Sequence, residues 1–456
     1  MYPAKIPDPM TLAFRSDENS RFVRALLADQ GIAPGAVPLD VDARDEMLEF
    51  LVGGCEGDRE RGLFAYFRSG LSIADAMAQI LRWRFGDLGR IERLLDFASG
   101  YGRVTRFLLR HVPAERLWVS DIYAGAVRFQ EERFGVHGMV STLRPEDLAC
   151  AERFDAILVT SLFTHLPEDR FIGWLRRLLG LLRPGGLLVF SVHDETIRDP
   201  SVPMPEAGLL FQELSESRTL EPGDYGSTWV TEAFVRSAVA RAAEEPVSVW
   251  RASLGLCNFQ DLYVAVRDDG AGRSELTFQT EPFLRIETCS LETPDLLTLS
   301  GWSVVLSGEA REVQASLDGR IVAASPVVGP RSDVAAELKD ERFARSGWKL
   351  TVPLPSGLDR NAALLILRVV DARGVGHPLW ASTVETALLH VARQDVKLLD
   401  RRLAETKERL AGAEARAAAE IEGLQARIAA MEASRFWKIR NVWFRLKGAF
   451  GFGERP

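Results

Sequence analysis

The stretch of sequence that decides the fold reads Leu94-Leu95-Asp96-Phe97-Ala98-Ser99-Gly100-Tyr101-Gly102-Arg103. Apolar strand formers lead to a carboxylate, two glycines follow, and a helical pattern begins at Val104. A strand, a tight turn and a helix N-terminus together make a pocket of nucleotide size at the carboxyl end of the strand. Gly100 and Gly102 have no Cβ, so a ligand can approach their backbone closely. Other buried strand–helix turns also carry two glycines, so the pattern predicts a nucleotide site only together with the surrounding sequence.

The surrounding sequence supplies further strands. Residues 117–121 read as a second strand that ends in Asp121, about 20 residues beyond the glycine turn, where an acid accepts hydrogen bonds from ribose hydroxyls. Two continuous apolar runs, 154–161 and 182–191, are typical of parallel strands covered on both faces. Because strands and helices alternate, we predict a doubly wound α/β fold.

These features resemble class I S-adenosylmethionine-dependent methyltransferases over about residues 60 to 267. The resemblance rests on the spacing Asp-x-x-x-Gly-x-Gly, an acid ending the second strand, and the motifs Phe154-Asp155 and Arg183-Pro184-Gly185-Gly186. It implies a Rossmann-like methyltransferase domain that uses S-adenosylmethionine. Residues 161–167 and 260–264 are similar to bacterial members associated with surface polysaccharide biosynthesis.

The resemblance also implies which residues bind the cofactor. Asp96 and the backbone of the turn would hold the methionine part, Asp121 the ribose hydroxyls, and Ile122 would pack on the adenine; the turn residues are Ala98, Gly100 and Gly102. Ala98 departs from the family, in which glycine is usual, and this costs little unless φ is positive there.

The sequence does not single out one residue that recognises the adenine. The family often has an acid after the third strand, where this chain has Arg144, with Glu146 or Asp147 as substitutes.

An NAD-dependent dehydrogenase is the competing enzyme class. It would need Gly-x-Gly-x-x-Gly directly after the first strand and no acid at the end of that strand. This chain lacks that glycine motif, and its first strand ends in an acid.

Composition restricts the remaining function classes. The chain has 456 residues, 46% hydrophobic and 26% charged, which suits about three soluble domains. A net charge of −8 argues against nucleic-acid binding. Its 4 cysteines are far apart, so we expect no metal site and a reduced, cytoplasmic setting. We find no signal-peptide pattern in residues 1–20 and no apolar run of bilayer length.

Five regions follow one another along the chain. We expect a helical N-terminal region that covers the cofactor (1–85), the methyltransferase domain (86–267), an immunoglobulin-like β-sandwich (277–384), a coiled coil (386–433) and a basic amphipathic tail (434–456). Tyr66 or Arg68 of the first region would meet the cofactor carboxylate, unless this helix only packs. The sandwich is either structural or carbohydrate-binding.

The last two regions indicate partners. Apolar residues recur at heptad spacing from Leu389 to Met431, with one stutter, which predicts a coiled coil and a homo-oligomer; a single helix folded back on the sandwich is the alternative. The tail combines Trp443 and other apolar residues on one face with basic residues such as Arg435. This pattern is typical of helices that bind an anionic membrane surface, and a groove on a partner protein is the alternative.

Transfer of a methyl group to a hydroxyl needs a base near the carboxyl ends of the fourth and fifth strands. His165 and His193 occupy those positions, and a neutral histidine can accept the proton. Either histidine also suits a packing role. Asp194, Glu195 and Tyr225 are further candidates for acceptor contacts.

We therefore expect a methyltransferase that acts on a sugar hydroxyl of a surface polysaccharide or of its lipid-linked precursor. By analogy of architecture, it would be cytoplasmic and peripheral at the inner face of the plasma membrane. The alternative is a catalytically degenerate scaffold or length-setting spacer in a membrane-associated polysaccharide assembly. Ala98 and Arg144 favour that alternative, whereas Asp96 and Asp121 argue against it.

Overall fold

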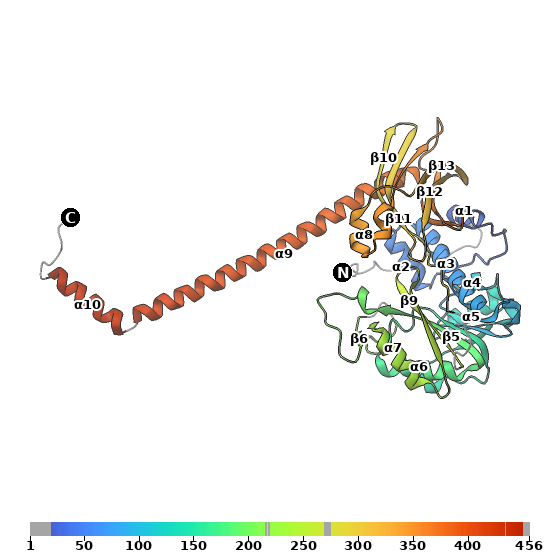
Figure 1. The fold of residues 1–456 in the computed structure, drawn as a ribbon, viewed down its shortest axis with the longest axis horizontal. Helices are drawn as coiled ribbons and strands as arrows, with labels where there is room; N and C mark the ends of the chain where they lie inside the picture. Colours follow the sequence, from blue (N-terminus) through green and yellow to red (C-terminus); the bar gives the residue numbers. More distant parts are fainter. Residues whose placement is uncertain (1–19, 215–216, 218, 269–274, 434, 450–456) are drawn as a thin grey trace. The chain divides into compact units, whose positions relative to one another are not determined.

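A computed structural model describes residues 20–214, 217, 219–268, 275–433 and 435–449 (Figure 1). Two compact units divide the chain, Met1–Ala387 and Leu388–Pro456. Some side chains of the second unit, and residues 434 and 450–456 of the expected tail, lie outside the described residues.

Three helices form the N-terminal part of the first unit: α1 (Arg21–Asp29), α2 (Glu46–Gly54) and α3 (Arg59–Phe85). Each begins at a side chain that accepts backbone N–H groups of the first turn, namely Ser20, Asp45 and Asp58. Such capping oxygens satisfy helix donors that have no partner within the helix. The long helix α3 buries one face over most of its length.

A nine-stranded mixed sheet follows. Its parallel part runs in the order β3-β2-β1-β4-β5, made of β1 (Leu94–Phe97), β2 (Leu117–Asp121), β3 (His137–Val140), β4 (Phe154–Val159) and β5 (Leu182–Asp194). An antiparallel hairpin, β8 (Ser248–Leu256) and β9 (Gln260–Val266), pairs with β5 through β9. The predicted Rossmann-like α/β fold is confirmed, with antiparallel strands added to its edge.

The end of β5 carries a further hairpin that the sequence did not predict. Residues His193 and Asp194 pair in parallel with β7 (Ser227–Val230), which pairs in turn with β6 (Leu209–Gln212). This hairpin therefore lies at the carboxyl end of the parallel strands, where ligands bind in open α/β sheets.

Helices cover both faces of the sheet, which gives it two hydrophobic cores. Leu94 of β1 packs in the core that α3 also enters, whereas its neighbour Leu95 packs in the core formed with α6 (Glu168–Gly180) and α7 (Glu232–Ala242). Neighbouring residues of a strand point to opposite faces, so both faces of β1 are buried. The remaining helices here are α4 (Thr105–Leu108), α5 (Ala124–Phe134), and the short 3-10 helices η1 (Leu88–Arg90), η2 (Ala114–Arg116), η3 (Pro145–Asp147) and η4 (Glu195–Ile197).

The last part of the first unit holds two antiparallel sheets. One has the order β10-β11-β14 and the other β13-β12-β15-β16. Their elements are β10 (Phe283–Thr293), β11 (Leu296–Val304), β12 (Ala310–Leu317), β13 (Arg320–Pro326), α8 (Ser332–Leu338), η5 (Glu341–Arg345), β14 (Gly347–Pro353), β15 (Leu364–Asp371) and β16 (Gly376–Thr383). This part contacts the N-terminal helices, because Asp29 forms an ion pair with Arg368 and Gln79 bonds the backbone of Gln279 in both directions.

Two helices complete the chain, α9 (Val384–Ala433) and α10 (Arg435–Ala449). At about 1.5 Å per residue, α9 is about 75 Å long. Among the described residues, we find no helix long and apolar enough to cross a membrane.

Candidate active site

Asp96 lies at the carboxyl end of β1 and is almost fully buried. Its Oδ2 accepts a 2.7 Å hydrogen bond from Oγ1 of Thr105, while its buried Oδ1 has no hydrogen-bond partner among the described residues. Burial and, to a smaller extent, the nearby Asp121 raise the pKa of Asp96 to about 7. An acceptor that is desolvated and only half satisfied is poised for a charged donor from a ligand.

The turn after Asp96 has three residues with positive φ: Ala98 (57°), Gly100 (56°) and Gly102 (80°). A Cβ on Gly102 would collide with the ring of Phe134 and lie 2.8 Å from Oε1 of Gln130, so only glycine fits. Ala98 adopts the left-handed region despite its Cβ. Its departure from the family therefore does strain the backbone.

Asp121, at the end of β2, is held by the same turn. Its Oδ2 accepts a 2.8 Å hydrogen bond from the backbone N–H of Gly100, and its Oδ1 accepts one of 3.0 Å from the N–H of Tyr123. Burial raises the pKa of Asp121, which these backbone donors oppose. The carboxylate therefore faces the glycine turn in a fixed orientation.

Gln130 of α5 is a supporting residue that the sequence did not single out. Its Nε2 donates 2.9 Å hydrogen bonds to Oγ of Ser99 and to the carbonyl of Gly100. The residue is fully buried. Gln130 therefore stabilises the glycine turn from helix α5.

His165 follows β4 and His193 lies near the end of β5, two strands on the opposite side of β1 from β2. Nδ1 of His165 lies 2.7 Å from the carbonyl oxygen of Gly226, which can only accept, so Nδ1 carries the proton and Nε2 keeps its lone pair. The His165 ring stacks on Tyr225 with a centroid distance of 4.3 Å. Burial lowers the pKa of His165 to about 4, so the ring is neutral at pH 7.

His193 belongs to the same cluster. Its ring lies edge-on to Phe259, 5.3 Å between centroids, and 6.1 Å from Trp229 of β7. Its pKa is lowered to about 4, first by burial and then by the neighbouring charge of His165. Phe259 itself, in the turn between β8 and β9, is 53% exposed. The structure thus brings both predicted histidines together with exposed aromatic surface.

The β6–β7 hairpin joins the two halves of the site. The backbone N–H of Gly226 donates to the carbonyl of His165, and the hydroxyl of Tyr123 hydrogen-bonds Ser217 and Thr219. One inserted segment therefore contacts both the acid end of β2 and the histidine side.

Residues 95–188 match the family model described as "Methyltransferase domain". The chain contains a methyltransferase domain. The expected enzyme class is thereby confirmed. No curated protein matches the chain.

Solved structures that match include other methyltransferases of low identity. CalS10, an amino pentose methyltransferase from Micromonospora echinaspora with bound S-adenosylmethionine, is 17% identical, with a TM-score of 0.33 over 44% of this chain and 92% of that one. DesVI from Streptomyces venezuelae is 15% identical, with a TM-score of 0.35 over 50% of this chain and 100% of that one. The N-methyltransferase NodS from Bradyrhizobium japonicum is 18% identical, with a TM-score of 0.29 over 42% of this chain and 86% of that one.

The residues of the methyltransferase domain fit S-adenosylmethionine. Oδ1 of Asp96 is a buried acceptor without a described partner, which suits the ammonium of the methionine part. A Cβ built on Gly100 would meet nothing within 4 Å, so there is open space beside this residue of the turn. Asp121 offers a carboxylate in the position that recognises ribose hydroxyls.

For Tyr66 and Arg68 of α3, the structure favours the alternative that this helix only packs. The Tyr66 hydroxyl is fully buried and donates a 2.5 Å hydrogen bond to Asp45, and Arg68 forms a 3.1 Å ion pair with Glu281. Both side chains are therefore already engaged and unavailable to the cofactor carboxylate. Their partners lie about 20 and 200 residues away in sequence, so no local pattern indicated them.

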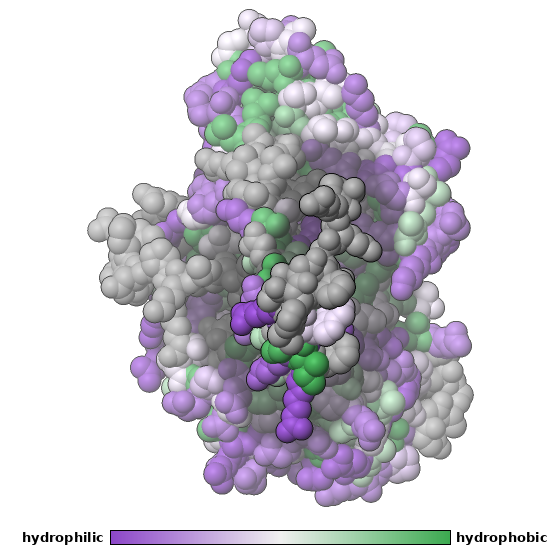
Figure 2. Space-filling model, turned by 90° about the vertical axis from the view of Figure 1, so that its left-hand side faces the viewer, coloured by the Kyte–Doolittle hydropathy of each residue, from purple (hydrophilic) through white to green (hydrophobic). Residues whose placement is uncertain are grey.

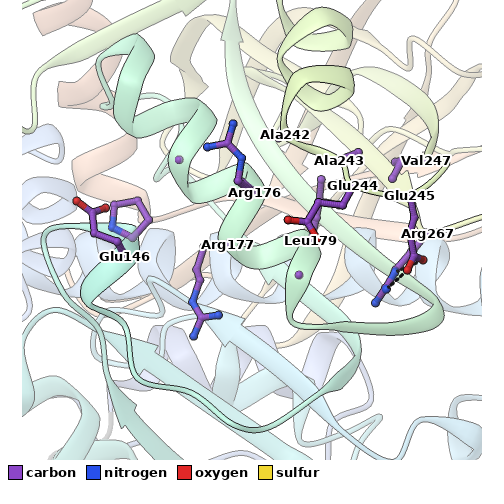
Figure 3. Close-up of a pocket in the computed structure, with 13 residues that line it drawn as sticks. Glu146, Arg176, Arg177, Leu179, Ala242, Ala243, Glu244, Glu245, Val247 and Arg267 are labelled. Atoms are coloured by element: carbon purple, nitrogen blue, oxygen red, sulfur yellow. Dashed lines mark hydrogen bonds and ion pairs between the residues drawn. The ribbon is translucent and has the colours of Figure 1, made fainter.

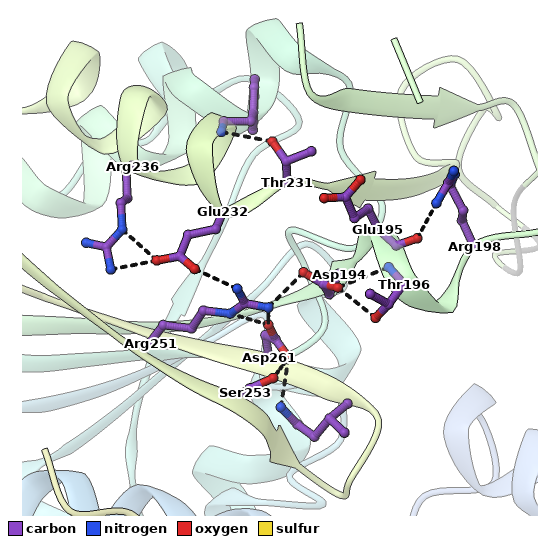
Figure 4. A network of polar contacts seen from close by, with 12 residues as sticks. Asp194, Glu195, Thr196, Arg198, Thr231, Glu232, Arg236, Arg251, Ser253 and Asp261 are labelled. Atoms are coloured by element: carbon purple, nitrogen blue, oxygen red, sulfur yellow. Dashed lines mark hydrogen bonds and ion pairs between the residues drawn. The ribbon is translucent and has the colours of Figure 1, made fainter. Parts of the chain in front are cut away.

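Asp194 is also engaged elsewhere in the methyltransferase domain. Arg251 donates to Asp194 (2.8 Å), Glu232 (2.6 Å) and Asp261 (2.6 Å), as Figure 4 shows. The arginine ties β8 to β9, α7 and the end of β5. Asp194 thus helps to join these elements, whereas the carboxylate of Glu195 points away from this network in Figure 4.

A groove of about 330 Å³ lies elsewhere on the domain (Figure 3). Its lining includes Glu146 of η3, Arg176 of α6, Glu244, and Arg267 just after β9. The end of β9 pairs with the start of the parallel part of β5, so this groove reaches the amino ends of the strands. Asp96, Asp121 and His165 do not line it. It exposes Glu146, one of the residues weighed for adenine recognition, and that assignment stays a prediction.

Proposed function

We propose that the chain transfers the methyl group of S-adenosylmethionine to a sugar hydroxyl of a surface polysaccharide or its lipid-linked precursor. The observation that carries the proposal is the hydrogen bond between Nδ1 of His165 and the Gly226 carbonyl. It fixes the tautomer in which Nε2 can accept a proton. A hydroxyl acceptor needs such a base, whereas a neutral amine carries its own lone pair to the methyl carbon.

The cofactor, when bound, supplies an activated methyl carbon on a sulfonium, and the protein supplies position and a proton acceptor. Asp96 would hold the methionine part of the cofactor, and Asp121 would hold its ribose, beside the glycine turn. Nε2 of His165 would take the hydroxyl proton as the acceptor oxygen displaces the neutral thioether from the methyl carbon. Because burial lowers the pKa of His165 to about 4, the ring is unprotonated at neutral pH.

A sugar acceptor suits the surfaces around the histidines. Sites for small polar ligands combine aromatic walls with a few placed hydrogen-bonding groups. Phe259 and Tyr225 provide aromatic faces, and Ser161 and Gln260 hydrogen-bond each other at 3.1–3.2 Å on the same side. Ser161 has a positive φ of 63°, a strained conformation that often occurs at functional positions.

The second unit supports a role at a membrane. Exposed apolar residues of α9 and α10 include Leu410, Ile421, Leu424, Ile428, Met431, Ile439, Val442, Trp443 and Phe444. Those of α9 would pair with a second copy as a coiled coil and form a homo-oligomer. Those of α10 lie beside basic residues such as Arg440, which stacks on Trp437 at 3.7 Å. Figure 2 shows hydrophobic (green) and hydrophilic (purple) residues next to one another on the face turned toward the viewer.

An anionic membrane surface matches both the apolar and the basic character of α10. We therefore place the enzyme in the cytoplasm, peripheral at the inner face of the plasma membrane, with α9 as the spacer. The two antiparallel sheets would form an immunoglobulin-like sandwich with a structural or carbohydrate-binding role.

The test is methyl transfer from radiolabelled S-adenosylmethionine to surface polysaccharides and to lipid-linked oligosaccharides. We expect incorporation as an alkali-stable ether, and a loss of at least about 100-fold in kcat for His165→Gln with unchanged affinity for S-adenosylhomocysteine. His111→Gln, a substitution of a histidine outside the site, is the matched control. Unchanged kcat in His165→Gln would refute the assignment of the base.

A degenerate scaffold or spacer is the second candidate, favoured by the strained Ala98 in the glycine turn. A scaffold would keep the oligomer and the membrane contact but would bind no S-adenosylmethionine. Cofactor binding therefore separates the two candidates.

A further inference from the structure

Arg103 follows the last glycine of the turn, and its side chain reaches helix α3. Its Nη1 donates a 2.9 Å hydrogen bond to Oγ of Ser69, and Ser69 in turn donates to the carbonyl of Tyr66. The backbone of Arg103 also packs on α3 at Gly70, where an added Cβ would collide with the Arg103 carbonyl oxygen. Helix α3 therefore holds Arg103 at the edge of the turn.

This guanidinium is close enough to the end of β1 to act on Asp96. Its positive charge lowers the pKa of Asp96, opposing the rise caused by burial. It also lowers the pKa of Cys257 in the β8–β9 turn. The side chain of Arg103 thus extends from the turn after β1 to Ser69 of α3.

The other arginines around the turn are occupied. Arg68 pairs with Glu281, Arg44 pairs with Asp42 at 2.7 Å, and Arg106 is buried. Arg106 donates to the carbonyls of Gly102 and Pro38 and lies over the rings of Tyr66, Phe67 and Phe134. In the described part of the chain, Arg103 has no carboxylate partner, and Nη1 is the one side-chain nitrogen seen to donate.

The two ends of the methionine part carry opposite charges. A buried, half-satisfied carboxylate suits its ammonium, and a guanidinium suits its carboxylate because planar donors pair with both oxygens. Asp96 and Arg103 offer these two groups on either side of the glycine turn.

We propose that Arg103 binds the carboxylate of S-adenosylmethionine, while Oδ1 of Asp96 accepts from its ammonium. This assignment rests on the methyltransferase identification and gives to Arg103 the role that Arg68 and Tyr66 cannot fill. Arg103 is then a cofactor-binding residue, and Ser69 positions its side chain.

The test is calorimetric titration of the full chain with three probes. S-adenosylmethionine carries both charged groups, decarboxylated S-adenosylmethionine lacks only the carboxylate, and 5′-methylthioadenosine lacks both. We expect Arg103→Met to lose about 30- to 100-fold in affinity for S-adenosylmethionine. Its affinity for the two probes without a carboxylate should change by less than about 3-fold. Asp96→Asn should lose affinity for both ligands that carry the amine.

Two further variants control for folding and for bulk charge. Arg128→Met makes the same change on an exposed position of α5 and should leave all three affinities unchanged. Arg103→Lys keeps the charge without the planar fork and should recover part of the lost affinity. Circular dichroism and the midpoint of thermal unfolding check that each variant is folded.

Two results would overturn the assignment of Arg103 alone. One is unchanged affinity of Arg103→Met for S-adenosylmethionine, and the other is an equal loss for all three probes. If the unaltered protein binds none of the probes, the cofactor assignment fails together with the role of Arg103.

Discussion

The backbone N–H of Gly100 donates a 2.8 Å hydrogen bond to Oδ2 of Asp121. This contact joins the glycine turn after β1 to the acid that ends β2. Tyr123 fixes the second oxygen of the same carboxylate at 3.0 Å. The ribose-binding acid is therefore oriented by backbone donors before a ligand arrives, which reduces the cost of ordering the site on binding.

The strain at Ala98 leads to the first prediction. Ala98→Gly should raise the free energy of unfolding by about 0.5–1 kcal/mol, because relief of the left-handed Cβ strain exceeds the entropy that glycine loses. Urea denaturation measures the change. Ala240→Gly, on the exposed side of α7, is the control and should lose about 1 kcal/mol. Destabilisation by Ala98→Gly would contradict the conformation assigned to this turn.

The buried Asp96 gives the second prediction. Its pKa in the folded protein, about 7, lies above the usual value of 3.8, so the folded state binds more protons between these values. Its contribution to stability is therefore lost as pH rises from about 4 to 7. Asp96→Asn should stabilise the ligand-free protein by about 2–4 kcal/mol at pH 8, and by little at pH 4. Thermal unfolding at both values checks this, and equal stability at pH 8 would contradict the burial of a charged Asp96.

The two histidines change the pH dependence of stability in the opposite direction. Burial lowers the pKa of His165 and His193 to about 4, below the usual 6.5. The unfolded chain then binds more protons, so stability is complete above pH 6.5 and falls as pH drops toward 4. The double substitution His165→Gln, His193→Gln should reduce this acid loss by about 1–3 kcal/mol per histidine. An unchanged slope between pH 6.5 and 4.5 would show that the rings are hydrated.

The tail gives the fourth prediction. Removing three exposed charges with Arg435→Gln, Lys438→Gln and Arg445→Gln should weaken binding to phosphatidylserine vesicles by about 100-fold, since each basic residue contributes about 1 kcal/mol. Deletion of residues 434–456 should abolish co-sedimentation. Neutral phosphatidylcholine vesicles are the control. Unchanged sedimentation after the deletion would favour a partner protein over the membrane.

Much of the sheet was predictable because its signals are local. The run that ends in Asp121 coincides with β2, and the apolar run from Phe154 begins β4 at the same residue. Acids at the carboxyl ends of neighbouring parallel strands must meet at one edge. Asp121 is accordingly close enough to Asp96 to raise the pKa of the Asp96 carboxyl.

The rest depends on contacts between distant residues. Asp45 is about 20 residues before its partner Tyr66, and Glu281 lies on the far side of the methyltransferase domain from Arg68 in sequence. The short strands β6 and β7 carry no strong alternation, so their pairing with the end of β5 follows from tertiary packing. The sign of φ at Ala98 could not be predicted either, because contacts of this turn with other segments determine it.

The most direct test of the account is calorimetric titration of the full chain with S-adenosylmethionine, beside the double variant Asp96→Ala, Asp121→Ala. The account predicts micromolar affinity that the variant loses, with both proteins folded by circular dichroism. Absence of binding by the unaltered protein would contradict the central claim and favour the scaffold.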